Sequence, residues 1–265
     1  MENTFVSVVI LSMKPPKRLL QDLDNQRYPY FEIIIAREKG PVNAMNKALE
    51  KAKGDIFVRI DDDVKLPPEW LLNLVAPFDD PMVAGVTGPT FVPEDRMMNR
   101  DSIKYARNPG LFLRWLYDND PYAPAKIYKC GNVSYGSNFV DKLEHRDHYA
   151  IDHLEGTNWA MRTDLIRKVG GFDTKFDGVG EWFDTDVEFK IKKLGYELYY
   201  NRYAIVWHIL EKGEHYSERF EGIGRIKNWL RFHIRHSKFH WKMIVFLFTW
   251  GIYFLLKNVQ RKGER

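Results

Sequence analysis

The 265-residue sequence predicts an α/β fold built on a mostly parallel sheet with helices on its faces. Three segments predict it: apolar runs at residues 5–11 and 31–36, and between them residues 17–26, which place three leucines on one helical face. A strand, a helix and a strand at this spacing form a βαβ unit, whose two strands are parallel. An α/β fold with a parallel sheet is therefore the starting expectation.

The later elements follow from the same patterns. We expect helices over residues 42–52, 66–78 and about 184–194, and strands over residues 56–60, 82–91 and 204–207. Gly85 and Gly88 in the strand at 82–91 would allow close approach of another backbone. Residues 92–153 show no clean period, so we expect long connections there that form part of an acceptor pocket.

Composition indicates a globular intracellular protein. The chain is 45% hydrophobic and 29% charged, and Cys130 is its one cysteine, which fits a reducing compartment. No secretory signal is visible at the amino terminus, so we expect the catalytic part to be cytoplasmic. Residues 211–265 carry 12 Lys and Arg against 5 Asp and Glu, a balance of +7 in a chain whose net charge is +4, so the excess positive charge lies in the tail. Nucleic acid is not an expected partner, because its binders more often carry the basic patch on the folded domain.

An acidic triplet, Asp61, Asp62 and Asp63, follows the short strand at residues 56–60. Alternation places Asp61 and Asp63 on one side and Asp62 on the other. Oxygen ligands suit Mg²⁺ or Mn²⁺, and such ions bridge carboxylates to substrate phosphates. A solvated turn or a helix cap is the competing interpretation, but the position at the carboxyl end of a strand favours a ligand site.

Two other groups of polar residues stand at element ends. Asn43, Asn46 and Lys47 lie in the first turns of a predicted helix, where unpaired N–H groups favour phosphate, although an ordinary surface helix would look the same. Asp184 and Asp186 open a later helix, where acids are also common without catalysis. His208 follows the last strand, and its significance depends on the acidic pair.

Taken in order, these motifs resemble the family 2 glycosyltransferases over about the first 210 residues. The matching motifs are the strand ending at Leu11, Gly40 through Asn46, Gly54-Asp55, Asp61-x-Asp63, Gly156-x-Asn158-x-Ala160-x-Arg162, Gly170-Gly171-Phe172-Asp173, Asp184-x-Asp186, Gly195-Tyr196 and His208. The resemblance implies a GT-A fold and an inverting transfer from a nucleoside-diphosphate sugar to a hydroxyl acceptor.

The resemblance also implies residue roles. Asp184 would be the general base, and Asp61, Asp63 and His208 would bind Mn²⁺ or Mg²⁺. The expected nucleotide-sugar contacts are Leu11, Ser12, Glu38, Asn43, Asn46, Lys47, Asp61, Asp62, Asn158 and Arg162. Arg162 or Lys47 would help to neutralise the leaving diphosphate.

The sequence departs from the family pattern in three places. Phe183 replaces the glutamate that usually precedes the base, so Glu181 or Asp186 is an alternative base. The acidic loop after the second strand is short, and Glu38 would stand in for it, which leaves the nucleotide open. The first strand ends in Leu-Ser-Met where many members have Pro-Thr. Trp159 and Trp182 would stack on an acceptor or pack in the core.

Two domains are expected: a catalytic domain at residues 1–210, and a basic, helical region at residues 211–265. Residues 243–256 form an uncharged run between Lys242 and Lys257, shorter than the roughly 20 residues that span a bilayer. Basic flanks with tryptophans favour a helix lying on an anionic membrane, which would make the protein peripheral and its acceptor a lipid-linked or cell-surface glycan. Docking on the catalytic domain and homodimerisation are the alternatives.

Two other functions compete with sugar transfer. A metal-dependent phosphotransferase would use the acidic triplet as nucleophile, but it would leave Asp184 and His208 without a role. A non-catalytic nucleotide-sugar binding module would keep the sheet without needing both a metal pair and a distant base.

Overall fold

The structure is a computed structural model that describes residues 4–14, 16–92, 107–135, 139, 142, 149–176, 178, 180–209 and 222–263, without the side chains of 149, 222 and 253–263. The expected boundary near residue 210 and much of the region 92–153 lie outside the described residues.

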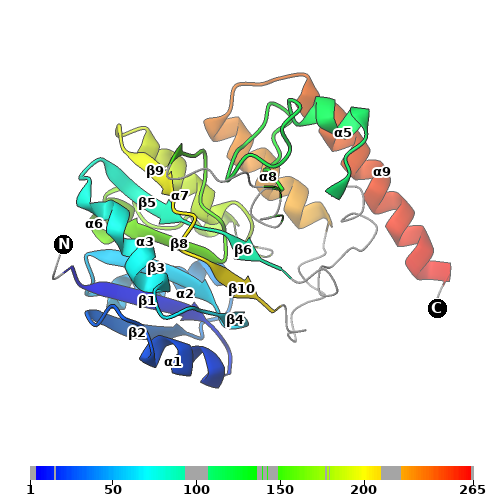
Figure 1. Cartoon of the computed structure of the whole chain (residues 1–265). Helices are drawn as coiled ribbons and strands as arrows, with labels where there is room; N and C mark the ends of the chain where they lie inside the picture. The colour runs from blue at the N-terminus through cyan, green and yellow to red at the C-terminus, as the bar shows by residue number, and fades with distance from the viewer. Residues whose placement is uncertain are drawn as a thin grey trace.

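A seven-stranded sheet forms the centre, in the order β2-β1-β3-β8-β5-β9-β7 (Figure 1). Its strands are β1 (Val6–Leu11), β2 (Phe31–Ala36), β3 (Ile56–Asp61), β5 (Val83–Thr87), β7 (Tyr149–Ala150), β8 (Asn158–Arg162) and β9 (Glu197–Tyr200). β1 is parallel to β2 and β3, as the βαβ pattern predicts. β8 runs antiparallel between β3 and β5, and β7 runs antiparallel to β9. The other five strands share one direction, so the sheet is mostly parallel, as the sequence analysis expected.

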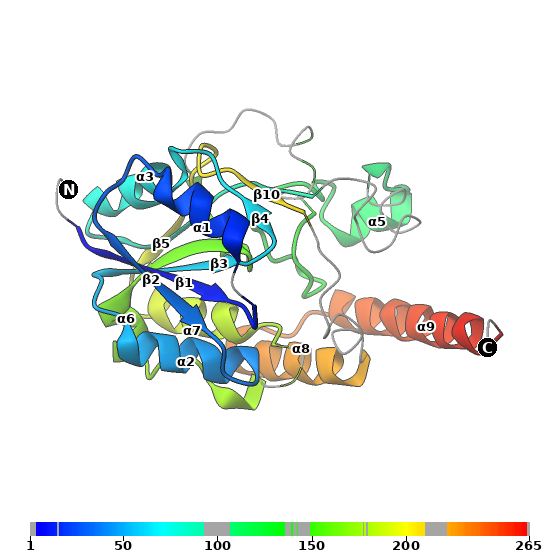
Figure 2. The same ribbon diagram turned by 90° about the horizontal axis from the view of Figure 1, so that it is seen from below.

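Helices cover both faces of the sheet (Figure 2). α1 (Lys17–Asp24) and α3 (Trp70–Val75) lie on one face, and α2 (Pro41–Lys51), α6 (Thr163–Lys168) and α7 (Phe183–Lys192) lie on the other. Because side chains alternate along a strand, Val8 of β1 packs with the first group and Val9 with the second. Burying each such side chain contributes about 1.5–3 kcal/mol, and two cores therefore hold the sheet between the helices.

A second, smaller sheet consists of three short strands. Its order is β4-β10-β6, formed by β4 (Val64–Lys65), β10 (Val206–His208) and β6 (Thr90–Phe91). The segment 82–91, expected as one strand, is divided between the two sheets. The chain turns at Gly88, where an added Cβ would lie 2.3 Å from the carbonyl oxygen of Ala204. This contact confirms the close backbone approach expected at Gly88.

The carboxyl-terminal region is helical and packs on the α/β domain. It contains α8 (Gly222–His236) and α9 (Lys242–Gly263), and α9 lies near α5 (Leu111–Leu116) (Figure 1). Trp229 and Phe232 of α8 are 3% and 0% exposed. Phe246 of α9 packs on a small cluster that includes Leu116 and Tyr117. None of the described helices has the length and apolar character needed to cross a membrane.

Candidate active site

Strand β3 carries the first part of the site. Phe57 and Arg59 face α7: Phe57 belongs to the same buried cluster as α7, and the guanidinium of Arg59 lies over the ring of Phe183. Val58 packs on the opposite side of the sheet with α1 and α3. Asp61, two residues after Arg59, lies opposite Leu11 of β1. The charged side chains of β3 therefore stand at the carboxyl ends of parallel strands, where α/β sheets bind ligands.

Asp61, Asp63 and His208 form a cluster that could hold a metal ion, called here the cation cluster. Each offers one ligand atom, and these atoms lie within 4.8 Å of one another. β10 pairs antiparallel with β4 and sets His208 opposite Val64, next to Asp63. Two carboxylates and an imidazole at this spacing fit a divalent cation such as Mn²⁺ or Mg²⁺.

Arg59 joins the cation cluster to Asp184. Its Nη2 donates to Asp61 Oδ1 at 3.2 Å, and its Nη1 donates to Asp184 Oδ2 at 3.0 Å. The side chains of Arg59, Asp61 and Asp184 are 13%, 13% and 9% exposed, so water screens these ion pairs weakly. The guanidinium of Arg59 therefore bridges Asp184, the expected base, and Asp61, one of the expected cation ligands.

The other side of Asp184 meets backbone and a glycine. Asp184 Oδ1 accepts a hydrogen bond from the Thr185 amide at 3.0 Å, at the start of α7. A Cβ at Gly156 would lie 3.7 Å from Asp184 Oδ2 and 3.8 Å from Arg59 Nη1. The loop before β8 therefore lines the site, and glycine there leaves the space beside the carboxylate open.

Several expected donor contacts lie at this same sheet edge. Ser12 follows Leu11, and its Oγ lies 2.5 Å from Asp62 Oδ2, so Asp62 has a partner different from that of Asp61. Glu38 follows β2 and forms an ion pair of 3.2 Å with Lys51. Asn43 is exposed in the first turn of α2. These positions border the ends of β1 and β2.

Arg162 does not reach the site. β8 is antiparallel to β3, so Arg162 lies opposite Ile56 at the start of β3. Its guanidinium donates to the carbonyl oxygens of Phe78, Asp80 and Val83. The structure therefore places Arg162 at the edge opposite Asp61, where it fastens β8 to the segment before β5.

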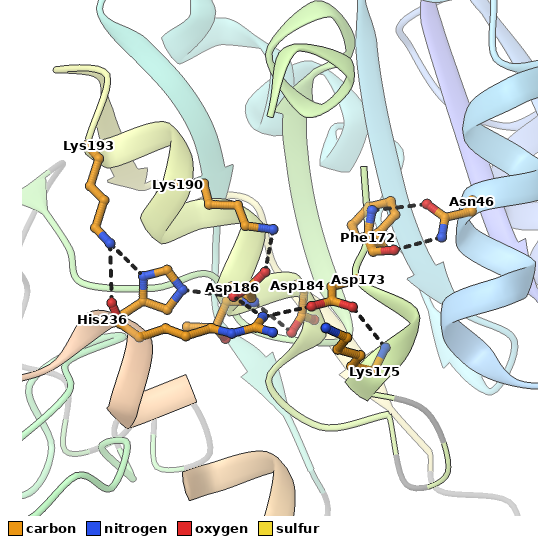
Figure 3. A network of polar contacts seen from close by, with 11 residues as sticks. Asn46, Phe172, Asp173, Lys175, Asp184, Asp186, Lys190, Lys193 and His236 are labelled. Carbon is orange, nitrogen blue, oxygen red and sulfur yellow. Dashed lines mark hydrogen bonds and ion pairs between the residues drawn. The ribbon is translucent and has the colours of Figure 1, made fainter. Parts of the chain in front are cut away.

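Asn158, Asn46 and Lys47 also have other partners. Asn158 lies near the end of β3, but it is fully buried, accepts from Trp70 Nε1 at 2.9 Å and donates to the Ala204 carbonyl at 2.8 Å. Asn46 exchanges two hydrogen bonds with the backbone of Phe172 (Figure 3). Lys47 forms an exposed ion pair with Glu50, and it is not part of the cluster of charges around Asp184.

The two tryptophans expected to stack on an acceptor are packed against protein. Trp159 is fully buried, with its ring 6.0 Å from that of Phe57. Trp182 is half-buried, and its ring lies 4.7 Å from that of Phe232 in α8. The structure gives both residues the core-packing role that the sequence analysis left open.

Asp186, one alternative base, anchors α8 to α7 (Figure 3). It is fully buried and is bound by Lys190 at 2.7 Å, His236 at 2.8 Å and Arg235 at 3.2 Å. Burial alone would raise the pKa of Asp186, but hydrogen bonds from His236 and Lys190 outweigh burial and lower it to about 2. Such a carboxylate is a weak proton acceptor near neutral pH. Glu181, the other alternative, pairs with Arg225 of α8 at 2.8 Å.

Glu188 lies one turn after Asp184 on α7 and is fully buried. Its Oε2 accepts from the Leu154 amide at 3.0 Å, whereas its Oε1 has no hydrogen-bond partner among the described residues. Burial, and next the charge of Asp184, raise the pKa of Glu188 well above its usual value. Burial therefore favours the protonated form of Glu188 more than in an exposed glutamate.

Arg59 is the site residue that the sequence analysis missed. A visible signal was available, because Arg59 is the one charged residue inside the apolar strand Ile56-Phe-Val-Arg-Ile60. A buried cation needs a partner, and the acids downstream are the nearest candidates. Arg59 and Asp184 are 125 positions apart in the chain, so their ion pair could be identified only from the fold.

The fold is that of the GT-A glycosyltransferases. It is similar to mannosyltransferase PcManGT from Pyrobaculum calidifontis, solved with GDP-Man and Mn²⁺, with a TM-score of 0.55 and 18% identity, covering 91% of this chain and 67% of that one. It is also similar to GalNAc-T7 solved with UDP, GalNAc and Mn²⁺, with a TM-score of 0.51 and 14% identity, covering 88% of this chain and 48% of that one.

The sequence confirms the family. Residues 12–170 match the family described as Glycosyl transferase family 2, so the chain belongs to this family. A curated relative, the glucosyl-dolichyl phosphate glucuronosyltransferase of Haloferax volcanii, is 26% identical over 177 residues, which are 65% of this chain and 48% of the relative. The chain thus spans about half the length of that relative. The family match contains the acidic triplet and ends before Asp184 and His208, whose roles depend on the geometry.

Proposed function

We propose that this protein transfers a sugar from a nucleoside-diphosphate sugar to a hydroxyl acceptor, with inversion at the anomeric carbon. The observation that carries the proposal is the meeting of Asp184 with the cation cluster at one sheet edge, through Arg59. A base and a cation site side by side are what this displacement needs.

Asp184 would act as the base. Its carboxylate takes the proton from the acceptor hydroxyl while the acceptor oxygen forms a bond to the anomeric carbon. The bond between that carbon and the diphosphate oxygen breaks, and the diphosphate leaves with the electron pair. Because attack and departure occur on opposite faces, the configuration inverts. Gly156 leaves room for the acceptor beside Asp184.

The cation cluster would hold the donor. Asp61, Asp63 and His208 would bind Mn²⁺ or Mg²⁺, an ion that neutralises charge on a departing diphosphate. The nucleotide would lie along the ends of β1 and β2, near Ser12 and Glu38. Because the structural relatives named above were solved with Mn²⁺, we take Mn²⁺ as the first ion to test.

Transfer can be tested with a panel of nucleotide sugars. Thermal shift with and without Mn²⁺ identifies the donor, because a ligand that binds the native state raises the melting temperature. The donor is then incubated with polyprenyl-phosphate-linked sugars, and NMR reads the anomeric configuration of the product. Binding without transfer or donor hydrolysis would indicate a non-catalytic module. Transfer of phosphate rather than sugar would indicate a phosphotransferase, and a retained configuration would exclude inversion.

A lipid-linked or cell-surface glycan acceptor is the second part of the proposal, and it is supported by an exposed apolar stripe that begins just before α9 and continues along it. The stripe consists of Trp241, Ile244, Phe248 and Ile252, which are 54%, 58%, 69% and 41% exposed. Spacings of three and four residues place them on one helix face. The opposite face of α9 packs on the protein through Phe246.

Helix α5 extends the stripe. The ring of Trp115 lies 5.3 Å from that of Trp241, and Leu111 and Phe112 beside it are 88% and 49% exposed. Arg114 on α5 and Lys238 before α9 are exposed cations near this face. Apolar side chains, tryptophans and cations together suit the surface of an anionic bilayer. We therefore propose a peripheral protein on the cytoplasmic face, where the single cysteine stays reduced.

Vesicle flotation tests this part. We expect the whole chain to float with vesicles that contain phosphatidylglycerol, and Phe248→Glu to reduce flotation. The matched control Leu72→Glu, on α3 and 43% exposed, should float like the wild type. Equal flotation of both variants would overturn the membrane proposal, and a concentration-dependent dimer that Phe248→Glu breaks would assign the stripe to self-association. Substitution is preferable to truncation before α8, because truncation would remove the buried ring of Phe232 and uncover the apolar cluster that it shares with Phe183 and Val187 of α7.

A further inference from the structure

Arg59 occupies an unusual place for a cation. It lies in a central strand, its side chain is 13% exposed, and its guanidinium carbon is 5.5 Å from the centre of the Phe183 ring. Taking a guanidinium out of water is unfavourable unless anions compensate it. Two anions do so here, Asp61 through Nη2 and Asp184 through Nη1.

The two anions belong to different parts of the proposed machinery. Asp61 is a member of the cation cluster, and Asp184 is the proposed base. A divalent ion at the cluster and the guanidinium of Arg59 would share the same Asp61 carboxylate. Like charges that share one anion at low exposure repel each other. The charge of Arg59 therefore lowers the affinity of the cluster for the ion. Asp184 reduces this effect, because it also pairs with Arg59 and so weakens the pairing of Arg59 with Asp61.

We propose that Arg59 is a positioning residue that couples the cation cluster to Asp184: it orients the Asp184 carboxylate and lowers the affinity of the cluster for a divalent ion. The inference rests on the proposed function for the role of Asp184, but ion binding can be measured with no donor or acceptor present. Because Arg59 pairs with both carboxylates, we expect a change at Asp184 to alter the ion affinity of the cluster through Arg59.

The sign of each effect distinguishes coupling from a purely structural role. Arg59→Met removes the opposing charge, so we expect Mn²⁺ to bind about tenfold more tightly, the size of a moderate charge interaction. Asp184→Asn leaves Asp61 as the one anion that pairs with Arg59 in the described part of the chain, so Mn²⁺ should bind more weakly. In the double variant the effect of Asp184→Asn on Mn²⁺ affinity should reverse or vanish, because its intermediary is gone.

Stability gives a second readout. Without Mn²⁺, Arg59→Met leaves two carboxylates of low exposure uncompensated, so its melting temperature should fall. Added Mn²⁺ should restore more of the melting temperature in Arg59→Met than it adds to the wild type. Arg59→Lys keeps the charge on a single nitrogen and should retain wild-type Mn²⁺ affinity while losing the orientation of Asp184, so kcat should fall without a matching change in KM.

The experiment is a double-mutant cycle on Mn²⁺ affinity, measured by titration calorimetry on the whole chain. Arg167→Met is the matched control, because Arg167 donates to the carbonyls of Leu49 and Ala52 at the end of α2 and should leave Mn²⁺ affinity unchanged. Unchanged or weaker binding in Arg59→Met, or additive effects in the cycle, would overturn the coupling, as would the absence of Mn²⁺ binding. If the Mn²⁺ affinities follow the predicted cycle but no sugar is transferred, the coupling is supported and the proposed reaction is contradicted. If sugar is transferred but the affinities do not follow the cycle, the reaction is supported and the coupling is contradicted.

Discussion

His208 Nε2 lies 2.9 Å from Asp63 Oδ1, although 145 residues separate them in the chain. The contact exists because β10 returns beside β4, the two-residue strand that directly follows the acidic triplet. The small sheet therefore completes the cation cluster, and the central sheet supplies only Asp61 to it.

Replacement of this histidine tests the cluster. His208→Ala removes one of three ligands, so we expect Mn²⁺ affinity to fall by at least about tenfold, as loss of a supporting group at a metal site commonly does. Titration calorimetry measures the change. His240→Ala, between α8 and α9, is the control and should bind Mn²⁺ like the wild type. Equal affinity in both variants would remove His208 from the cluster.

Asp184→Asn tests the base. The amide keeps an oxygen that can accept from the Thr185 amide, so the fold should persist, but it cannot take a proton. We expect kcat for sugar transfer to fall about 10²–10⁴-fold, the usual contribution of a general base. Circular dichroism should show a melting temperature near that of the wild type. The control is Asp164→Asn, at an exposed position on α6. If Asp184→Asn turned over as fast as this control, another residue would be the base.

The anchor at Asp186 predicts sensitivity to acid. Its folded pKa of about 2 lies below its usual value of 3.8, so it stabilises the folded state above about pH 3.8 and loses this effect as pH falls towards 2. The shift corresponds to about 2 kcal/mol. At pH 7, Asp186→Asn should melt at a lower temperature than the wild type. Between about pH 4 and 2, the melting temperature of the variant should fall less than that of the wild type. Parallel pH profiles would contradict the anchor.

Glu188 predicts the opposite dependence. Its folded pKa is raised by burial, so the unfolded state ionises first, and stability falls as pH rises above its usual pKa of 4.5. Glu188→Gln removes this ionisation and can still accept from the Leu154 amide. As pH rises above about 4.5, we expect the melting temperature of the variant to rise relative to that of the wild type. A difference that stays constant as pH rises would show that Glu188 does not change its ionisation on unfolding.

Local patterns predicted the first half of the fold well. The apolar runs of β1 and β2 and the amphipathic α2 are confirmed because each depends on its own sequence, and the acidic triplet lies at a strand end for the same reason. The family was recognised from the order of short motifs, and it is confirmed. Asp61, Asp63 and His208 lie together as their assignment to one site required.

Long-range strand pairing limited the rest. The antiparallel direction of β8 cannot be inferred from residues 158–162 alone, and this direction moves Arg162 to the far edge of the sheet. The burial of Trp159 follows from the same placement between β3 and β5. Trp182 and Asp186 also look like site residues until α8, which lies far away in sequence, covers them.

The position of α8 has a consequence for biosynthesis. Phe232, near the end of α8, belongs to the same apolar core as Phe183 and Val187 of α7. While the ribosome is still translating the segment between these helices, the nascent chain holds α7 with one side uncovered. Such transiently exposed apolar surface is what chaperones recognise. The domain that carries the proposed site therefore finishes folding only after α8, residues 222–236, has been made.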